Sequence, residues 1–258
     1  MTFSLQFLGT CACDYSPKLK AEYKDCFDKN ARRSSCALLN GKFLIDCGEH
    51  CLDSIRIAGV DMAAITDIFV THLHSDHYNA GHIQTIAAAA DRTLRVWVRG
   101  DAVVPEIAGV EWRKMDKKTQ YDVADGLKAM GLLANHDEIV FPQHFLFEKD
   151  GKKFFYGCDG AWFLNETYYA LKNADLALCV LDCTSGDYNG DFRMGEHNSI
   201  PMLRVMLPSL KTWKTVTENT RTFISHLAPS LHAPHDKTVE IMQKMGVEVA
   251  YDGLIVEA

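Results

Sequence analysis

Three histidines and one aspartate lie close together in the segment Thr71-His72-Leu73-His74-Ser75-Asp76-His77, at the end of an apolar run. Imidazole and carboxylate groups are ligands that suit zinc, manganese or iron. His72 and His74, two positions apart, can reach one ion, while Asp76 and His77 can turn toward a second. A solvated loop is the alternative. The restrictive H-x-H-x-D-H spacing directly after a predicted strand favours a metal site.

The composition is that of an ordinary soluble globular protein. The chain has 258 residues, of which 47% are apolar and 24% are charged, which allows a normal core. The net charge of −7 disfavours a broad nucleic-acid-binding surface. Bound metal ions could still attract a small phosphate-bearing substrate. We expect a cytoplasmic protein with mostly reduced thiols and no membrane span, because no signal-peptide pattern or long apolar run is visible.

Short apolar runs alternate with helical patterns, which predicts a mixed α/β architecture. No repeat or linker is visible, so a single domain over residues 1–258 is expected. Strands are expected at 3–8, 37–46 (a hairpin), 65–71, 94–98, 131–134, 145–148 paired with 153–156, 176–181, 221–224 and 247–251, and helices at 81–90, 199–207 and 237–245.

Residues 11–35 form a long polar connection without a clear period. Such connections are often functional, and we expect either a lid or substrate loop, or an ordered surface loop with a short helix at 19–26. The roles of Cys11, Cys13 and Cys26 are open.

Further ligands are expected directly after other strands. His136 follows the apolar run at 131–134 and is favoured over His144, which begins a hairpin strand. Asp159 lies in Gly157-Cys158-Asp159-Gly160, where a turn aspartate is the alternative. Beside the histidine cluster, a carboxylate that bridges two ions is the better interpretation.

Two further histidine regions are candidates. His226 directly follows the apolar run 223–225, whereas His232 and His235 are expected at the surface or the pocket rim. His197 precedes a predicted helix. It is either a surface loop histidine or a general acid outside the metal ligands.

These residues resemble the metallo-β-lactamase superfamily. The resemblance is carried by His72 to His77, by Leu44-Ile45-Asp46-Cys47-Gly48-Glu49 and by Tyr156-Gly157-Cys158-Asp159. Within the superfamily the chain is similar to the branch of ribonuclease Z and the cyclic-phosphate phosphodiesterase of the carbon–phosphorus lyase pathway. The markers of that branch are Phe7-Leu8-Gly9-Thr10, Asp182-Cys183-Thr184 followed by Glu196-His197-Asn198, and Tyr251-Asp252-Gly253-Leu254.

The resemblance implies a four-layer αββα sandwich with a binuclear site at one edge, between two sheets. It implies two divalent ions, Zn²⁺ or Mn²⁺, with iron as a further option. One ion would be held by His72, His74 and His136. The other would be held by Asp76, His77 and His226, and Asp159 would bridge the two.

Three more roles follow from the same resemblance. His197 corresponds to the catalytic histidine outside the metal ligands, and Asp182 lies where an acidic partner could orient it. Together with the ligand Asp76, these are the expected catalytic residues. Asp46 corresponds to the aspartate that supports the histidine loop.

The chain differs from its relatives in two respects. The phosphodiesterase has a structural zinc site built from clustered cysteines and a histidine, but here the cysteines are dispersed and Pro229 occupies the place of the histidine. No Gly/Pro-rich insertion resembles the substrate arm of the tRNA endonuclease. With the acidic net charge, this argues against tRNA processing.

The expected function is a metal-dependent phosphodiesterase acting on a small phosphodiester, a cyclic one included, through a hydroxide shared by two ions. The alternatives are a carboxylic-ester, thioester or lactone hydrolase on the same site, and a non-catalytic metal-binding protein. The expected partner is a small molecule that contains phosphate. The oligomeric state is open, a homodimer included.

Overall fold

The computed structural model describes residues 2–188, 190 and 192–258, and its strands form two seven-stranded sheets. The first sheet has the order β14 (Ile255–Glu257), β1 (Ser4–Gly9), β2 (Cys36–Leu39), β3 (Phe43–Ile45), β4 (Asp67–Phe69), β5 (Leu94–Arg99) and β6 (Val110–Met115). The second has the order β13 (Glu248–Val249), β12 (Arg221–Ser225), β11 (Leu178–Asp182), β10 (Lys152–Gly157), β9 (Gln143–Lys149), β8 (Leu127–Leu133) and β7 (Gln120–Ala124).

The two sheets pack face to face through aromatic side chains. Phe7 of β1 contacts Phe223 of β12 with ring centroids 5.7 Å apart, and Phe69 of β4 contacts Phe145 of β9 at 5.4 Å. All four side chains are fully buried. Alternate residues along each strand point to this interface, as expected for two packed sheets.

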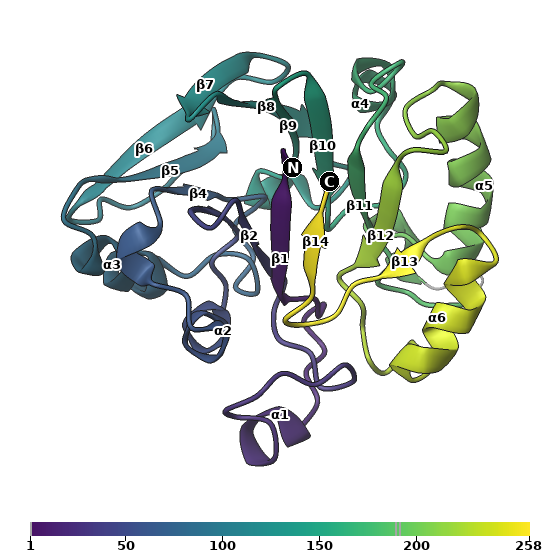
Figure 1. Cartoon of the computed structure of the whole chain (residues 1–258), viewed down its shortest axis with the longest axis horizontal. Coiled ribbons are helices and arrows are strands. Elements are labelled where there is room, and N and C mark those ends of the chain that lie inside the picture. The colour runs from purple at the N-terminus through teal and green to yellow at the C-terminus, as the bar shows by residue number, and fades with distance from the viewer. Residues whose placement is uncertain (1, 189, 191) are drawn as a thin grey trace.

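Helices cover the outer face of each sheet (Figure 1). The helices are α1 (Lys18–Ala21), α2 (Cys51–Ala58), α3 (Ala80–Ala89), α4 (Asn165–Ala170), α5 (Ile200–Thr212) and α6 (His235–Gln243), with 3₁₀ turns η1 (Met62–Ala64), η2 (Glu138–Val140) and η3 (Phe192–Gly195). Helices α2 and α3 pack on the first sheet, and α5 and α6 pack on the second. The expected αββα sandwich is therefore confirmed.

Strand direction brings the ends of four strands of the second sheet to one edge. Strand β9 is antiparallel to both β8 and β10, while β10, β11 and β12 are mutually parallel. Strands β8, β10, β11 and β12 therefore run the same way. Residues that follow these strands meet at the same edge of the sheet, which is the requirement for a shared site.

Most expected elements are present, but several boundaries were wrong. The strand expected at 65–71 is only Asp67–Phe69, because the amide of Thr71 donates to the Asp46 carboxylate and not to a neighbouring strand. The helix expected at 19–26 is only the single turn α1. The helix expected at 237–245 begins earlier, at His235. Helices α2 and α4 and strands β6, β7 and β14 were not foreseen.

None of the helices in the described part of the chain combines the length and apolarity needed to cross a membrane.

Candidate metal centre

The loop that carries the histidine cluster joins β4 to α3 and lies against the segment after β3. Cys47 donates its amide to the His77 carbonyl at 2.8 Å, and Glu49 donates to the Ser75 carbonyl at 3.0 Å. Between them, a Cβ on Gly48 would lie 1.8 Å from the Asp76 carbonyl oxygen. Only glycine allows this approach, so the backbone itself fixes the position of the loop.

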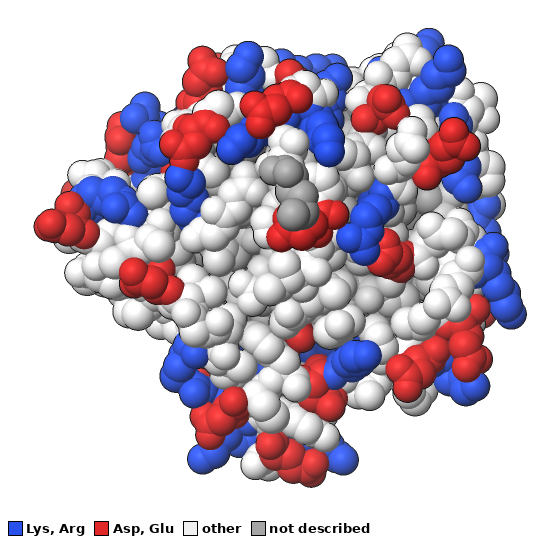
Figure 2. All heavy atoms as spheres, viewed as in Figure 1, with Lys and Arg blue, Asp and Glu red and all other residues white. Residues whose placement is uncertain are grey.

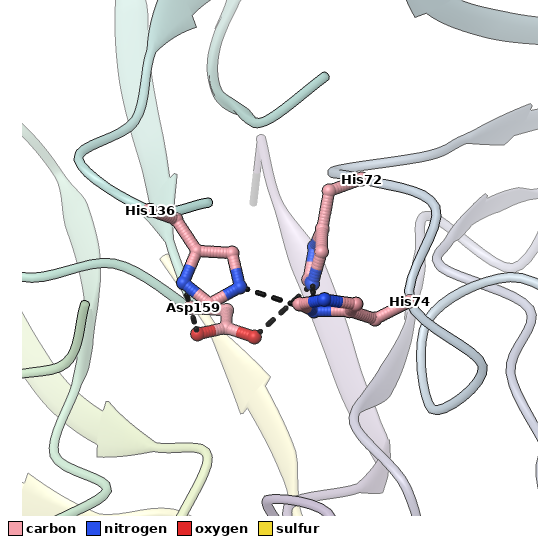
Figure 3. A group of neighbouring side chains, drawn as sticks. All are labelled: His72, His74, His136 and Asp159. Atoms are coloured by element: carbon pink, nitrogen blue, oxygen red, sulfur yellow. Dashed lines mark hydrogen bonds and ion pairs between the residues drawn. The ribbon is translucent and has the colours of Figure 1, made fainter. Parts of the chain in front are cut away.

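Three imidazole nitrogens converge in the first group of ligands (Figure 3). His74 Nδ1 lies 3.0 Å from His72 Nε2 and 3.1 Å from His136 Nε2. Three ring nitrogens that face one another at these distances are a donor set that a single cation could share. A tetrahedral zinc ion with Zn–N bonds of about 2.0–2.1 Å would give N···N edges of about 3.3 Å. The donor set therefore fits a zinc-sized cation.

A second group lies beside the first. His77 Nε2 is 3.3 Å from Asp76 Oδ2 and 3.1 Å from His226 Nε2. Asp159 Oδ2 is 3.3 Å from one nitrogen of the first group, that of His72, and 3.3 Å from both histidines of the second. The Asp159 carboxylate thus lies between the two groups, where a bridging ligand belongs. The seven side chains expected as ligands are all brought together.

The charges of the second group also fit a cation. Burial opposes a charge on His77 and His226, but the neighbouring carboxylates raise the pKa of His226 to about 9 and that of His77 well above its usual value. The carboxylates of Asp76 and Asp159 thus favour positive charge at this position, either as protons on the imidazoles or as a cation. A divalent ion would replace these protons, since ligands bind in their deprotonated form.

Asp46 supports the histidine loop from behind. It is fully buried, and it accepts hydrogen bonds from the Thr71 amide at 2.7 Å and the Thr71 hydroxyl at 2.9 Å. Its Oδ2 lies 2.8 Å from His77 Nδ1. A proton on His77 Nδ1 is thereby directed to Asp46, which leaves Nε2 available to a metal ion.

Three residues at the centre have left-handed backbone conformations. The φ angles are +64° at Asp46, +59° at Asp159 and +58° at His226. Such conformations are uncommon for residues other than glycine and cost of the order of 1 kcal/mol or more each. They turn the chain sharply at the strand ends, which directs the side chains into the centre.

His197 lies next to the ligands, in the turn between η3 and α5. Its Nδ1 is 2.8 Å from Asp159 Oδ1 and 3.5 Å from Asp182 Oδ2, and 14% of its side chain is exposed. Burial disfavours the charged imidazole, yet Asp159 and Asp182 together raise the pKa of His197 to about 11. His197 also lines a cavity of about 340 Å³, together with five of the candidate ligands, His74, Asp76, His136, Asp159 and His226.

His144, the competitor of His136, lies apart from the ligands. It is fully buried between Phe155 and Phe163, and neither ring nitrogen has a hydrogen-bond partner among the residues described. His232 and His235 also lie outside the two groups, where they contact the Cys183 carbonyl and the Arg32 guanidinium.

We expect His144 to make the protein sensitive to acid. Burial lowers the pKa of His144 to about 4. The unfolded chain therefore takes up a proton near pH 6.5, before the folded chain does, and stability falls as the pH decreases from 6.5 toward 4. The loss reaches about 2 kcal/mol at pH 5, at about 1.4 kcal/mol per pH unit.

His144→Leu should remove this loss. The check is urea unfolding of the metal-free wild type and variant at several values between pH 7.5 and 5. Metal-free protein is used so that metal release does not contribute. Equal pH dependence in the two proteins would contradict the prediction.

Residues 11–35 reach both the cavity and the outside of the first sheet. Ala12, Cys13 and Asp14 line the cavity. Farther along, Arg33 donates to the carbonyls of Tyr23 and Cys26, and its side chain is almost completely buried. The Arg33 amide donates to Asp252, and Arg56 of α2 pairs with Asp25, so the projecting turn in Figure 1 is tied to the sandwich.

Two threonines at the centre were not singled out from the sequence. The Thr71 hydroxyl contacts Asp46 and His77, and the Thr184 hydroxyl contacts Asp182 and His226. The only sequence signal was their position: Thr71 directly precedes the candidate ligand His72, and Thr184 lies two residues after Asp182. Threonines have too many structural roles for that position to reveal these contacts.

Comparison with known sequences gives matches to parts of the chain. A family model described as "Anti-Pycsar protein Apyc1" matches residues 4–88, from β1 to α3. The ribonuclease Z of Methanothermobacter thermautotrophicus is 45% identical over 51 residues, which are 19% of this chain and 17% of that protein. The ribonuclease Z of Mycobacterium marinum is 36% identical over 63 residues, 24% of this chain and 20% of that protein. The matched segments thus span about a fifth of these relatives.

Solved structures match the whole chain. The metallo-β-lactamase fold protein YhfI from Bacillus subtilis has a TM-score of 0.76 at 14% identity, with all of both chains covered. Zn²⁺-bound PqqB from Methylobacterium extorquens has a TM-score of 0.75 at 14% identity, covering 99% of this chain and 100% of that one. Human tRNase Z, short form, has a TM-score of 0.69 at 16% identity, covering 98% of each. This chain therefore has the metallo-β-lactamase fold.

Proposed function

We propose that the protein is a metal-dependent hydrolase with two divalent ions, and that its substrates are small phosphodiesters. The observation that carries the proposal is His197. It is an imidazole beside the two groups of ligands, its Nδ1 faces the carboxylates of Asp159 and Asp182, and it borders the cavity. A hydrolase that cleaves a poor leaving group needs such a proton donor.

His72, His74 and His136 would hold one ion and Asp76, His77 and His226 the other, with Asp159 between them. Zn²⁺ and Mn²⁺ both suit these ligands. Bound there, the ions would lower the pKa of a coordinated water and offset the negative charge of a phosphate group.

The roles of the other side chains follow from their hydrogen bonds. His197 keeps its Nδ1–H toward Asp159 and Asp182, which stabilises the charged imidazole. Its Nε2–H is then left for a substrate oxygen and can pass a proton to the departing alkoxide. Asp46 keeps His77 in the tautomer that binds metal.

The cavity favours a small substrate. Its volume is about 340 Å³, and its floor is formed by the metal ligands. On the face shown in Figure 2, acidic and basic side chains alternate around an uncharged centre, without a continuous basic surface for a nucleic acid. The short similarities to two ribonucleases support phosphodiester chemistry.

A substrate panel tests the proposal. Protein loaded with Zn²⁺ or Mn²⁺ is assayed with a linear phosphodiester, a cyclic phosphodiester, a thioester, a lactone and a β-lactam. We expect metal-dependent hydrolysis of a phosphodiester, abolished by a chelator and restored by the metal. Activity restricted to the lactone or thioester would replace the phosphodiesterase with an ester hydrolase. Absence of both metal binding and hydrolysis would leave a non-catalytic protein.

A further inference from the structure

The Thr184 hydroxyl contacts both a proposed metal ligand, His226, and the proposed general acid, His197. Thr184 is 3% exposed. Its Oγ1 lies 2.7 Å from Asp182 Oδ2, 2.7 Å from His226 Nδ1 and 3.2 Å from His197 Nδ1. The rings of His197 and His226 are stacked, with centroids 5.5 Å apart. One hydroxyl therefore contacts both imidazoles and the carboxylate behind them.

The direction of these hydrogen bonds follows from what each group can offer. Asp182 Oδ1 accepts from the Thr184 amide at 3.1 Å and the Asn198 amide at 2.7 Å, as an ionised carboxylate would. The single hydroxyl proton of Thr184 goes to Asp182 Oδ2 at 2.7 Å or to the His226 carbonyl at 3.0 Å, both of which can only accept. The hydroxyl has two lone pairs left and no further proton, so His226 donates from Nδ1, with the hydroxyl at 2.7 Å as the nearer acceptor and Asp182 Oδ2 at 3.2 Å as the other.

This arrangement determines which nitrogen of His226 is free. With the proton on Nδ1, the lone pair is on Nε2. That nitrogen lies 3.1 Å from His77 Nε2, 3.5 Å from Asp76 Oδ2 and 3.3 Å from Asp159 Oδ2. These atoms are the ligands of the proposed second ion. The hydrogen bond at Nδ1 thus leaves the Nε2 lone pair of His226 available to a metal ion.

The first sheet contributes a similar arrangement. The Thr71 hydroxyl lies 2.9 Å from each oxygen of Asp46, 3.1 Å from His72 Nδ1 and 3.3 Å from His77 Nδ1. Each sheet therefore contributes an aspartate, a threonine and two imidazoles whose Nδ1 atoms face the threonine hydroxyl. The Asp182–Thr184 pair is the counterpart of Asp46–Thr71.

We propose that Thr184 is a positioning residue that fixes the metal-binding tautomer of His226 and holds the His197 ring beside it. The inference rests on the proposed two-metal centre and goes beyond it, because it assigns a role to a side chain that binds neither metal nor substrate. Loss of the hydroxyl leaves Asp182 and His226 without their shared partner, a defect that a valine of similar shape cannot repair.

The test compares Thr184→Val with Thr184→Ser, which keeps the hydroxyl. Thr215→Val is the matched control, because Thr215 is equally buried but its hydroxyl donates to the Leu171 carbonyl away from the centre. Zn²⁺ affinities are measured by competition with a chromophoric chelator, which requires no activity. We expect Thr184→Val to weaken one of two Zn²⁺ sites by about 10–100-fold, the usual effect of losing a group that orients a ligand. Thr184→Ser and Thr215→Val should leave both sites close to wild type.

The outcomes separate this inference from the proposed function. Two unchanged Zn²⁺ affinities in Thr184→Val would overturn the role of Thr184 and leave the metal centre standing. Equal weakening of both sites, or weakening by Thr184→Ser as well, would also overturn it, because the effect would then be general. A wild-type protein that binds no metal would overturn both. If Thr184→Val does not fold, Thr184→Ala replaces it in the same measurement, with the same expected and contradicting results.

Discussion

Replacement of His197 by alanine is expected to lower kcat by about 10²–10⁴-fold, the usual range for a general acid, with the metal content unchanged. The reason is positional. His197 Nδ1 faces Asp159 and Asp182, and its ring borders the cavity. The other ring nitrogen is therefore the proton donor available to a leaving oxygen.

The leaving group makes this prediction specific. A phosphodiester with an alkoxide leaving group needs the proton, whereas one with a nitrophenolate leaving group needs it much less. His197→Ala should therefore impair the first substrate far more than the second, and metal analysis of the same samples should match the wild type. An equal loss on both substrates, or a loss of metal, would contradict the role of a general acid.

Replacement of Asp46 by asparagine is expected to weaken metal binding by about 10–100-fold. The amide group would present a donor to the Nδ1–H of His77, where the carboxylate now accepts. His77 could relieve this conflict by moving its proton to Nε2, and Nε2 would then no longer be a ligand. The Thr71 amide and hydroxyl would also lose part of the acceptor that fixes the loop.

Chelator competition and metal analysis after dialysis measure the effect of Asp46→Asn. Asp67→Asn serves as the matched control, because Asp67 is also a fully buried aspartate but accepts from Trp97 and Arg95 at the far end of β4. A variant with wild-type affinity for both ions would show that Asp46 does not orient His77.

The proximity of the seven candidate ligands could be predicted from the sequence because each lies shortly after a strand. His136, Asp159 and His226 come directly or shortly after β8, β10 and β12, whose common direction brings their ends together. The sequence favoured His136 over His144 but left His144 open, because both lie at the boundary of an apolar run. The structure places His144 inside β9, where it faces two phenylalanines.

The elements that were not foreseen have weak local patterns. Strand β6 has the sequence Val-Glu-Trp-Arg-Lys-Met and lies at an edge, where half of its side chains are exposed. Edge strands tolerate charged residues, so their sequences resemble loops. Helix α2 has only eight residues, and its clearest signal was Gly59, which ends it in a left-handed conformation.

Residues 11–35 could not be interpreted from the sequence because their contacts are distant along the chain. Arg56 of α2 forms an ion pair with Asp25 at 2.9 Å, and Asp252 accepts the Arg33 amide at 2.7 Å. Local periodicity contains no information about such contacts. We propose that the first residues of this segment shape the cavity, since Cys13 and Asp14 line it.

The division of the ligands between the two sheets has a thermodynamic consequence. His72, His74, Asp76 and His77 follow β4 of the first sheet, whereas His136, Asp159 and His226 follow strands of the second. A bound ion would therefore act as a cross-link between the two sheets, in addition to their apolar packing and to hydrogen bonds such as that from the Gln143 amide to the Thr71 carbonyl. Each ion that binds only the folded chain would add its binding free energy to the free energy of unfolding. A change that weakens the packing of the two sheets would therefore also weaken metal binding. Loss of the metal would then lower the stability of the folded protein as well as its catalytic activity.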